Sequence, residues 1–382
     1  MTVTGRCAPG YEAVREAFER NFAPTDTDPG DVGAAMALIH GGRVVVDLWG
    51  GSIRDEGPAW ERDTLVNMYS VGKPVAAVLA LDAVQRGEID LDEPLGAVWP
   101  AFRDLHGETT MRQVLAHQAG LPAVAEPLDP EAIYDWSAMA EALARTPAWW
   151  IPGSAHGYHT NTFGFLTGEP ICRLTQRPFS QALQDRICGP RGLDLFVGLP
   201  PSHHSRVAEI VSRVDPDSSP ADHRPAETKH DRMRAHTYFN PPTLSGFGVV
   251  NTADWRSASI PSTNGHATAR AMAQFYSALL PSAPEPLLAE SLRIEATTEH
   301  SVGPDLVLQR ETRFGLGFQL HQEIRAMGTG PNAFGHFGHG GSLGFADPDR
   351  DVAFCYLINH PGDRWQSPRT LRLVAAVADA TS

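Results

Sequence analysis

An α+β fold is predicted for this 382-residue chain, with a sheet assembled from both ends of the chain and a mainly helical middle. Two observations lead to this prediction. Apolar, β-prone runs lie near both ends, at 34–49 and at 352–358. Between about 88 and 200, helix-like stretches alternate with turns rich in proline and glycine, and few runs look like strands. A ligand is expected to bind in a cleft between two such units.

The N-terminal part of the chain predicts a helix, a hairpin and a second helix. Residues 11–22 place their apolar side chains on one face, as an amphipathic helix does. The β-prone runs 34–40 and 43–49 stand on either side of a Gly-Gly pair, which predicts a hairpin. A helical pattern over 74–86 then ends at a glycine.

The C-terminal part predicts two helices around a strand. The first helix covers about 267–280. Later, the sequence Asp-Pro-Asp-Arg at 347–350 predicts a turn that leads into the strand 352–358. A final apolar helix is predicted over roughly 368–380.

This order of elements predicts two units. Residues 1–73 and 240–382 are expected to form an α/β domain, and residues 74–239 a mainly helical domain. The segment 201–242 is rich in proline, serine, aspartate and histidine and has little apolar periodicity. It is therefore expected to be a long excursion over the surface.

Charge and composition exclude several classes of function. The formal net charge of −14 and the absence of a Lys/Arg-rich run argue against a nucleic-acid partner. The four cysteines are far apart and form no C-x-x-C pair, which favours reduced thiols. The first 22 residues lack the apolar core of a signal peptide, and no run is long enough to span a membrane. A cytoplasmic enzyme is the expectation.

The strongest candidate for catalysis is the Ser-x-x-Lys motif of Ser70 and Lys73. Pro74 fits the first turn of a helix, so a helix is expected to begin near Ser70. Spacing of i, i+3 would then place hydroxyl and amine on one face, with about 5–6 Å between Cβ atoms. A lysine with a depressed pKa can take the serine proton. The alternative is a capped helix with an exposed lysine, but Gly72 and the apolar flanks favour catalysis.

Other catalytic motifs do not match. A Walker A loop would need glycine where Asn67 stands, and a G-x-S-x-G elbow would need glycine in place of Thr243. His336 and His339 could bind a metal, but no H-E-x-x-H motif or carboxylate-rich partner accompanies them. No metal and no cofactor are expected.

Four stretches occur in a fixed order along the chain. They are Ser-Val-Gly-Lys-Pro-Val at 70–75, His-Gln-Ala-Gly-Leu-Pro at 117–122, Gly-Tyr-His-Thr at 157–160 and Phe-Gly-His-Gly-Gly-Ser at 337–342. In this set the chain resembles the serine β-lactamase and penicillin-binding-protein superfamily. It is most similar to class C β-lactamases and their esterase relatives, the family VIII carboxylesterases.

The resemblance implies a β-lactamase-like fold, in which an antiparallel sheet flanked by helices adjoins a mainly helical domain. It implies that Ser70 is the nucleophile and that Lys73 and Tyr158 form its base. The backbone N–H groups of Ser70 and Ser342 would form the oxyanion hole. Without the resemblance, a core tyrosine is the simpler interpretation of Tyr158. The residues expected to bind substrate are His339, Gly340, Gly341, His159, Trp150 and Phe345.

Two departures from the family pattern favour neutral esters. Thr160 stands where β-lactamases often have asparagine, and His339 stands where K-T-G supplies a permanent cation. Because histidine is largely neutral at pH 7 unless its pKa is shifted, both changes weaken the binding of an anionic peptide or β-lactam.

The leading hypothesis is a carboxylesterase that cleaves small carboxylic esters through an acyl-enzyme on Ser70. The alternatives are a β-lactamase, a D-amino-acid peptidase or amidase, an acyltransferase of secondary metabolism, and a catalytically silent binding protein with the same fold. The expected partner is a small-molecule ester or amide. The sequence does not separate hydrolysis from acyl transfer.

Overall fold

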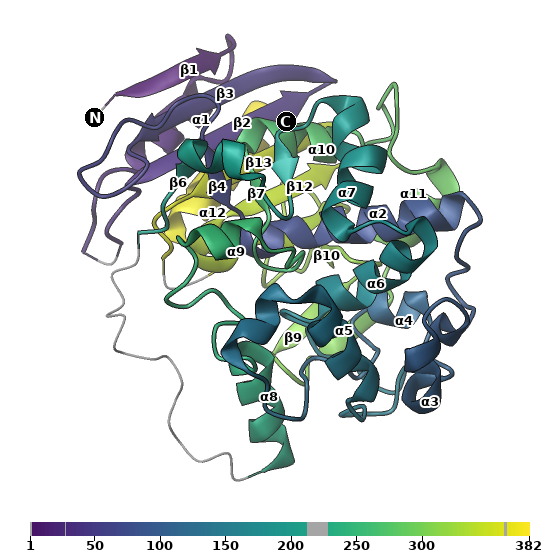
Figure 1. Cartoon of the computed structure of the whole chain (residues 1–382). Coiled ribbons are helices and arrows are strands. Elements are labelled where there is room, and N and C mark those ends of the chain that lie inside the picture. Colours follow the sequence, from purple (N-terminus) through teal and green to yellow (C-terminus); the bar gives the residue numbers. More distant parts are fainter. Residues whose placement is uncertain (1, 27, 212–227, 363–364) are drawn as a thin grey trace.

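Within the residues that the structure describes, nine strands form one antiparallel sheet (Figure 1). The structure is a computed structural model, and it describes residues 2–26, 28–211, 228–362 and 365–382. The spatial order β1-β3-β2-β13-β12-β11-β10-β9-β8 brings segments from both ends of the chain together at the centre of the sheet. The strands are β1 (Val3–Cys7), β2 (Gly33–His40), β3 (Arg43–Gly51), β8 (Ser301–Pro304), β9 (Glu311–Phe314), β10 (Gln319–Leu320), β11 (Phe334–Phe337), β12 (Leu343–Asp347) and β13 (Val352–Ile358).

The pairing of β2 with β13 confirms that the sheet is assembled from both ends of the chain. Ala34 lies opposite Ile358 in this antiparallel register. β2 and β3 form the predicted hairpin. Its turn residues Gly41 and Gly42 have φ values of +56° and +69°, a left-handed conformation that glycine adopts without steric cost.

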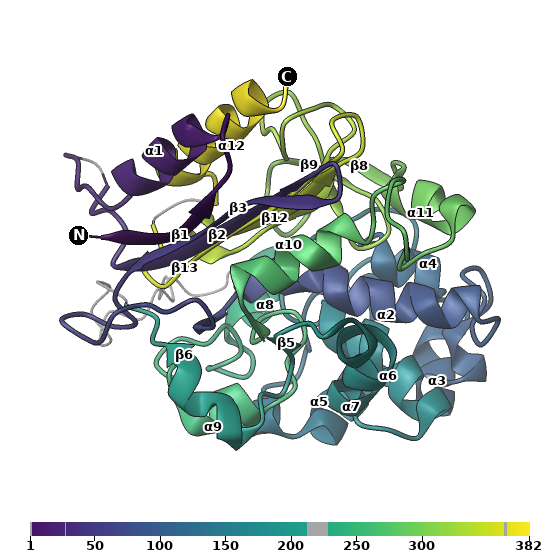
Figure 2. The ribbon, with the colours of Figure 1, turned by 90° about the horizontal axis from the view of Figure 1, so that it is seen from above.

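Helices cover both faces of this sheet (Figure 2). On one face, α1 (Glu12–Arg20) and α12 (Pro368–Ala380) pack against each other. On the other face, α10 (Ala269–Ser277) packs on β13 and β2. Periodicity predicted these three helices, and the structure confirms them; α1 and α10 are shorter at both ends than predicted. The two faces enclose separate apolar clusters.

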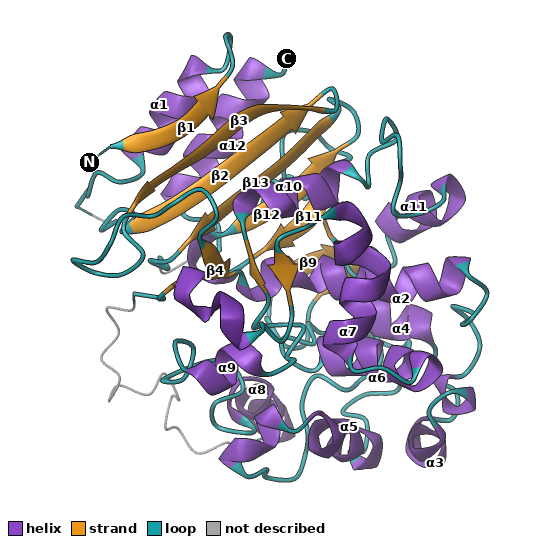
Figure 3. Cartoon of the chain, turned by 45° about the horizontal axis from the view of Figure 1, so that its top comes forward, coloured by secondary structure: helices purple, strands orange, loops and turns teal. Residues whose placement is uncertain are grey.

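The middle of the chain is mainly helical and is centred on α2 (Lys73–Gln85) (Figure 3). Residues from Lys73 to Ala83 are buried, because this helix is apolar on every side. α6 packs on α2, and α4, α5 and α7 pack on α6. The other helices are α3 (Arg103–His106), α4 (Met111–Leu115), α5 (Trp136–Arg145), α6 (Phe163–Thr175), α7 (Phe179–Leu183), α8 (Lys229–Phe239), α9 (Ala253–Ser257) and α11 (Glu290–Thr297).

A second sheet, with four short strands in the described part of the chain, leads to the Ser-x-x-Lys motif. Its order is β5-β7-β4-β6, and β4 runs directly into the turn that carries Ser70. It therefore joins segments from distant parts of the sequence around the motif. The strands are β4 (Leu65–Asn67), β5 (Leu195–Phe196), β6 (Val207–Ala208) and β7 (His266–Ala267).

The described flanks of the segment 201–242, predicted as a surface excursion, contain regular structure that the sequence did not predict. Residues 212–227 lie outside the described part of the chain. Before them, β6 pairs with β4. After them comes α8, with Met233 buried. Periodicity did not predict α8 because this helix has little apolar periodicity; a reciprocal capping box between Thr228 and Asp231 stabilises its start.

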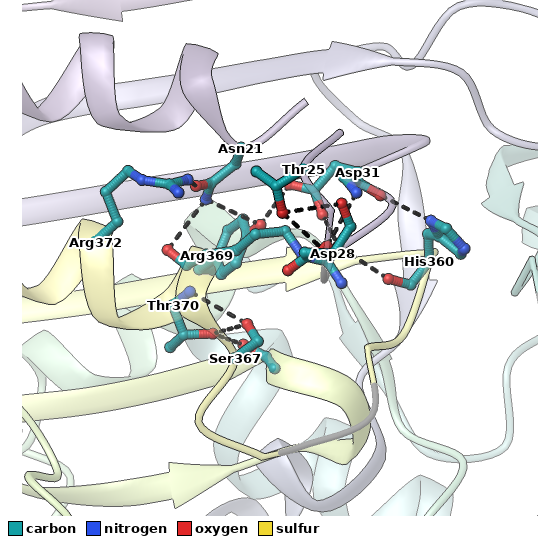
Figure 4. A network of polar contacts seen from close by, with 12 residues as sticks. Asn21, Thr25, Asp28, Asp31, His360, Ser367, Arg369, Thr370 and Arg372 are labelled. Carbon is teal, nitrogen blue, oxygen red and sulfur yellow. Dashed lines mark hydrogen bonds and ion pairs between the residues drawn. The ribbon is translucent and has the colours of Figure 1, made fainter. Parts of the chain in front are cut away.

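A buried polar network ties the segment before β2 to α12 (Figure 4). Arg369 is 2% exposed and forms ion pairs with Asp28, at 3.1 Å, and with Asp31. Tyr356 on β13 also donates a hydrogen bond to Asp31. Burial raises the pKa of Asp31 to about 6, even though Arg369 opposes the rise. Paired and hydrogen-bonded in this way, the buried charges hold the two ends of the described chain together.

No helix in the described ranges has both the length and the apolar character needed to cross a bilayer. The cysteines are all free thiols: Cys188 and Cys355 are buried, and Cys7 and Cys172 are half-buried. Burial raises the pKa of Cys355 well above its usual value, which keeps this thiol protonated.

Candidate active site

Ser70 lies on a short turn between a buried strand and a buried helix. The 3-10 turn η1 (Tyr69–Gly72) follows β4 and continues into α2. The sequence predicted that the helix begins near Ser70. In the structure Ser70 lies in the 3-10 turn, and the α-helix itself begins at Lys73. Tyr69 has a φ of +48°, a conformation that costs about 1–3 kcal/mol in a residue other than glycine and that concentrates at active sites. A strained turn thus presents the Ser70 hydroxyl.

The amine of Lys73 lies 2.9 Å from the hydroxyl of Ser70. It also donates a hydrogen bond to the carbonyl oxygen of Ser262 at 3.1 Å, and the Lys73 side chain is fully buried. Burial lowers the pKa of Lys73 well below its usual value of 10.5, with no neighbouring carboxylate in the described ranges to oppose it. A neutral amine held in this way has a lone pair that can accept the Ser70 proton.

Tyr158 forms the opposite wall of this small site. Its ring centroid is 4.8 Å from the Lys73 amine, and its side chain is fully buried. Both carboxylate oxygens of Asp305 accept a hydrogen bond from the Tyr158 backbone N–H at 3.1 Å, which fixes the position of the residue. Burial raises the pKa of Tyr158 well above its usual value, and hydrogen bonding with Ser70 offsets part of the rise. The phenol is therefore neutral at physiological pH and can donate a proton.

His336 completes the site and was missed as a catalytic neighbour in the sequence. Its Nδ1 donates to the carbonyl oxygen of Phe337 at 2.6 Å, which leaves Nε2 as an acceptor. That Nε2 lies 3.4 Å from the Tyr158 hydroxyl. Burial, with the neighbouring Lys73, lowers the pKa of His336 to about 3, so the imidazole stays neutral. No sequence pattern singles out His336 for this place; the packing of β11 against the nucleophile turn brings it there.

Strand β11, which approaches the nucleophile, ends at Phe337, and the chain then passes through Gly338. A Cβ added at Gly338 would lie 2.9 Å from the carbonyl oxygen of Met68, so only glycine lets this strand come so close to the turn. The next residue, His339, lines the cavity that Ser70 faces. Ser342, expected as an oxyanion-hole donor, lies just before β12 and does not line that cavity.

Gly340 and Gly341 do not line the cavity either; they allow close packing behind it. A Cβ at Gly340 would lie 2.2 Å from Cβ of Pro361, and one at Gly341 would lie 2.5 Å from Oγ of Ser367. Their positive φ values and missing side chains serve the packing of the turn 339–341, and their role in substrate binding stays a prediction.

A cavity of about 1190 Å³ opens beside Ser70. Ser70, Tyr158 and His339 share its wall, so the structure brings these three predicted residues together. Most of the remaining wall is aromatic or apolar, with contributions that the sequence did not predict. These include Tyr69, Tyr238, Phe247, Trp365, Ile210, Val250 and Leu371.

The other predicted substrate-binding residues lie elsewhere. His159 is fully buried and uses both ring nitrogens within the protein, accepting from the backbone N–H of Leu121 and donating to the carbonyl of Gly157. Trp150 packs against Gly157 and the ring of His159. Phe345 is buried on β12 and packs on Phe354, in the cluster on the α1 and α12 face of the sheet. Aromatic type alone did not separate core from pocket.

Thr160 and Asn161 both line the cavity, but the amide of Asn161 is engaged within the protein. Its Nδ2 donates to the carbonyl oxygen of Thr237 and to Oγ of Ser245. Its Oδ1 accepts from Thr263 at 2.7 Å. The Asn161 amide is therefore not offered to a substrate.

The described residues contain no group of three or more His, Cys, Asp or Glu side chains placed to hold a metal ion. What they provide is a nucleophile with a neutral amine as base, a neutral phenol beside it, and a glycine-bordered strand edge. This set of groups suits acyl transfer.

Activity is expected to rise with pH and then to level off, because only the neutral Lys73 amine can accept the Ser70 proton. The pKa of Lys73 is lowered, so the plateau is reached below its usual value of 10.5. The phenol of Tyr158 adds no falling limb, since its pKa is raised. The measurement is kcat/KM for an uncharged ester between about pH 4 and pH 10. A midpoint near 10.5 would contradict the assignment of Lys73 as a neutral base.

Comparison with known proteins gives one family over nearly the whole chain. The family model described as Beta-lactamase matches residues 18–379. The esterase/beta-lactamase LipL of Mycobacterium tuberculosis (strain ATCC 25618 / H37Rv) is 31% identical over 378 residues, which cover 94% of this chain and 83% of that protein.

Two solved structures are similar over their full length. A penicillin-binding-protein homologue from Caulobacter crescentus has 37% sequence identity and a TM-score of 0.87. A family VIII carboxylesterase has 31% identity and a TM-score of 0.88. In both comparisons the match covers 100% of this chain and 100% of the other.

Proposed function

This chain belongs to the beta-lactamase family, and from that membership we propose that it is a carboxylesterase that cleaves small carboxylic esters through an acyl-enzyme on Ser70. The observation that carries the proposal is the 2.9 Å contact between the Ser70 hydroxyl and the buried amine of Lys73. A nucleophile within hydrogen-bond distance of its base is the arrangement that acyl transfer requires.

In the proposed reaction, Oγ of Ser70 attacks the carbonyl carbon of the ester while its proton passes to Lys73. The backbone N–H groups of Ser70 and His339 donate to the oxyanion, with His339 in the place first expected for Ser342. The C–O bond to the alcohol then breaks, and the alcohol leaves with a proton relayed from Lys73 through Tyr158. Water attacks the acyl carbon, gives its proton to Lys73, and the serine departs with that proton.

Two features support an ester substrate over a β-lactam. The side chain that β11 places beside Tyr158 is the neutral imidazole of His336, whose pKa is lowered to about 3. Strand β11 contains no lysine or arginine. A carboxylate next to the reacting carbonyl would therefore find no cation on this strand. Aromatic and apolar side chains such as Phe247 and Trp365 make up much of the cavity wall, which suits the hydrocarbon part of an ester.

The test is a comparison of kcat/KM for p-nitrophenyl acetate and butyrate with kcat/KM for a chromogenic cephalosporin. We expect the better ester to exceed the cephalosporin by a factor of about 100 or more. A faster cephalosporin would overturn the esterase proposal in favour of a β-lactamase. Failure to cleave either substrate, with no labelling by a serine-directed phosphonate, would instead favour a catalytically silent binding protein.

A further inference from the structure

Arg310 is a half-buried cation next to the active site. It precedes β9, and its guanidinium centre lies 4.5 Å from the ring centroid of Trp365. Its Nε is buried without a hydrogen-bond partner, and it forms no ion pair within the ranges that the structure describes. Burial lowers the pKa of Arg310, but arginine remains charged at any physiological pH. A half-buried guanidinium without a counter-ion can still pair with an anion through its terminal N–H groups.

Asp305 is the carboxylate whose charge raises the pKa of Arg310, but the two side chains form no ion pair in the described ranges. It is buried, and its two oxygens already accept hydrogen bonds from four other groups. A second cation, Arg325, acts on Arg310 in the opposite sense and adds to the local positive charge. The donors to Asp305 are the backbone N–H groups of Tyr158, Val307 and Leu308 and the hydroxyl of Thr312.

Aromatic residues of the cavity wall connect Arg310 to the active site. Trp365, on which the guanidinium lies, is a cavity residue, and its ring centroid is 5.6 Å from that of Tyr158. Burial raises the pKa of both Tyr158 and Tyr238, two further residues of the wall, and the charge of Arg310 offsets part of each rise. The cation therefore acts on the part of the cavity next to the catalytic phenol.

On the basis of the proposed function, we propose that Arg310 binds a carboxylate of the substrate. The preferred substrates are then esters that carry a second, ionised carboxyl group. A guanidinium stacked on an indole ring keeps the N–H groups of its edge for a carboxylate, which it can bind in a bidentate manner. An anion bound by the terminal N–H groups would neutralise the unpaired charge.

The position of Arg310 also sets where that carboxylate lies in the substrate. The guanidinium centre lies 4.5 Å from the Trp365 ring centroid, which in turn lies 5.6 Å from that of Tyr158, and no direct contact joins Arg310 to Tyr158 in the described ranges. The carboxylate is therefore several bonds from the scissile carbonyl, as in a linear half-ester of a dicarboxylic acid. A carboxylate adjacent to the reacting carbonyl, as in a β-lactam, would not reach Arg310.

The test compares matched p-nitrophenyl esters on the wild-type enzyme and on Arg310→Leu. The charged substrates are the p-nitrophenyl half-esters of glutaric, adipic and pimelic acids, and each neutral counterpart ends in a methyl group instead of the carboxylate. We expect Arg310→Leu to raise KM about tenfold for the best half-ester, to change its kcat little, and to leave the neutral esters unchanged. Arg310→Lys should retain part of the preference, because it keeps the charge but not the fork.

Arg325→Leu is the matched control, because it removes a positive charge from the same neighbourhood, where Arg325 donates to the carbonyl of Glu311 rather than stacking on Trp365. It should leave the ratio of charged to neutral rates within about twofold of wild type. An equal drop in both Arg310→Leu and Arg325→Leu would overturn a specific contact and indicate general attraction. No change in the ratio with Arg310→Leu would overturn the proposal as well.

A binding measurement keeps this inference separate from the esterase proposal. The same half-esters can be titrated calorimetrically into Ser70→Ala protein, with and without Arg310→Leu, where no turnover is needed. About tenfold weaker binding of the half-ester, with unchanged binding of the neutral ester, would support the anion site even if the enzyme proved not to be an esterase. Equal affinity with and without Arg310 would sink it whatever the catalytic result.

Discussion

Ser70→Ala is expected to lower kcat/KM for a p-nitrophenyl ester by about 10⁴- to 10⁶-fold, which is the size of effect that loss of a nucleophile acting with its base produces. The reason is specific to the geometry. Within the described ranges the Lys73 amine has two hydrogen-bond contacts, Oγ of Ser70 and the carbonyl of Ser262, so no second hydroxyl stands ready to replace Ser70. The measurement is steady-state hydrolysis, joined to mass spectrometry after treatment with a serine-directed phosphonate.

Ser342→Ala serves as the matched control for this prediction. Ser342 belongs to the Gly-Gly-Ser stretch that first suggested an oxyanion donor, yet it lies outside the cavity wall and its Oγ accepts from the backbone N–H of Ile358. This variant should keep activity within a few-fold of wild type, and it should gain the phosphonate adduct that Ser70→Ala lacks. Normal activity in Ser70→Ala would refute the mechanism outright.

Lys73→Met is expected to lower kcat by about 10³- to 10⁴-fold while making the protein more stable. The loss follows from removing the base. The gain follows from the pKa, since a lysine that is charged when unfolded must give up its proton to be buried here. We expect the free energy of unfolding to rise by about 1–2 kcal/mol at neutral pH, less the hydrogen bonds lost. The gain should shrink as the pH rises toward about 10.5 and vanish above it, where the unfolded lysine is also neutral.

The chain offers a close control, because Lys229 is its one other lysine. Lys229 begins α8, and its amine donates to the carbonyl of Trp149. Lys229→Met should change neither kcat nor stability by more than a small factor. Denaturant unfolding monitored beside ester hydrolysis would decide the matter. A Lys73→Met protein that is less stable than wild type would mean that the buried amine serves the fold rather than catalysis.

Much of the fold was predictable because strong local patterns agreed with the tertiary structure. The Gly41-Gly42 hairpin, the strand 352–358 and the helix 368–380 are all where periodicity put them. The β-lactamase-like fold implied by the resemblance is confirmed by the family match and by solved structures with TM-scores of 0.87 and 0.88. Ser70 and Lys73 were identified correctly as neighbours, because their contact depends only on local spacing.

The walls of the site were harder to predict, because they come from residues distant in sequence. Trp150 and Phe345 look like pocket residues by type, but both side chains pack into apolar clusters. Phe345 does so through the alternation of side chains along β12, and Trp150 through local packing. Tyr238 lines the cavity from a helix whose sequence carries no apolar period, so periodicity did not find it. His336 and His339 are three residues apart on one strand and its turn, and only the tertiary structure shows that His336 faces the Tyr158 hydroxyl.

The antiparallel pairing of β2 with β13 has a consequence for the order of events during synthesis. Ala34 and Ile358 are partners in that pairing, so the central sheet cannot close until residues near 358 have left the ribosome. The turn that bears Ser70 emerges early, but the carbonyl of Ser262 and the strand of His336 arrive much later. Each new molecule therefore spends most of its synthesis without an assembled nucleophile. Reactivity toward esters in the cell should therefore appear late and abruptly, when β13 pairs with β2 and completes the central sheet.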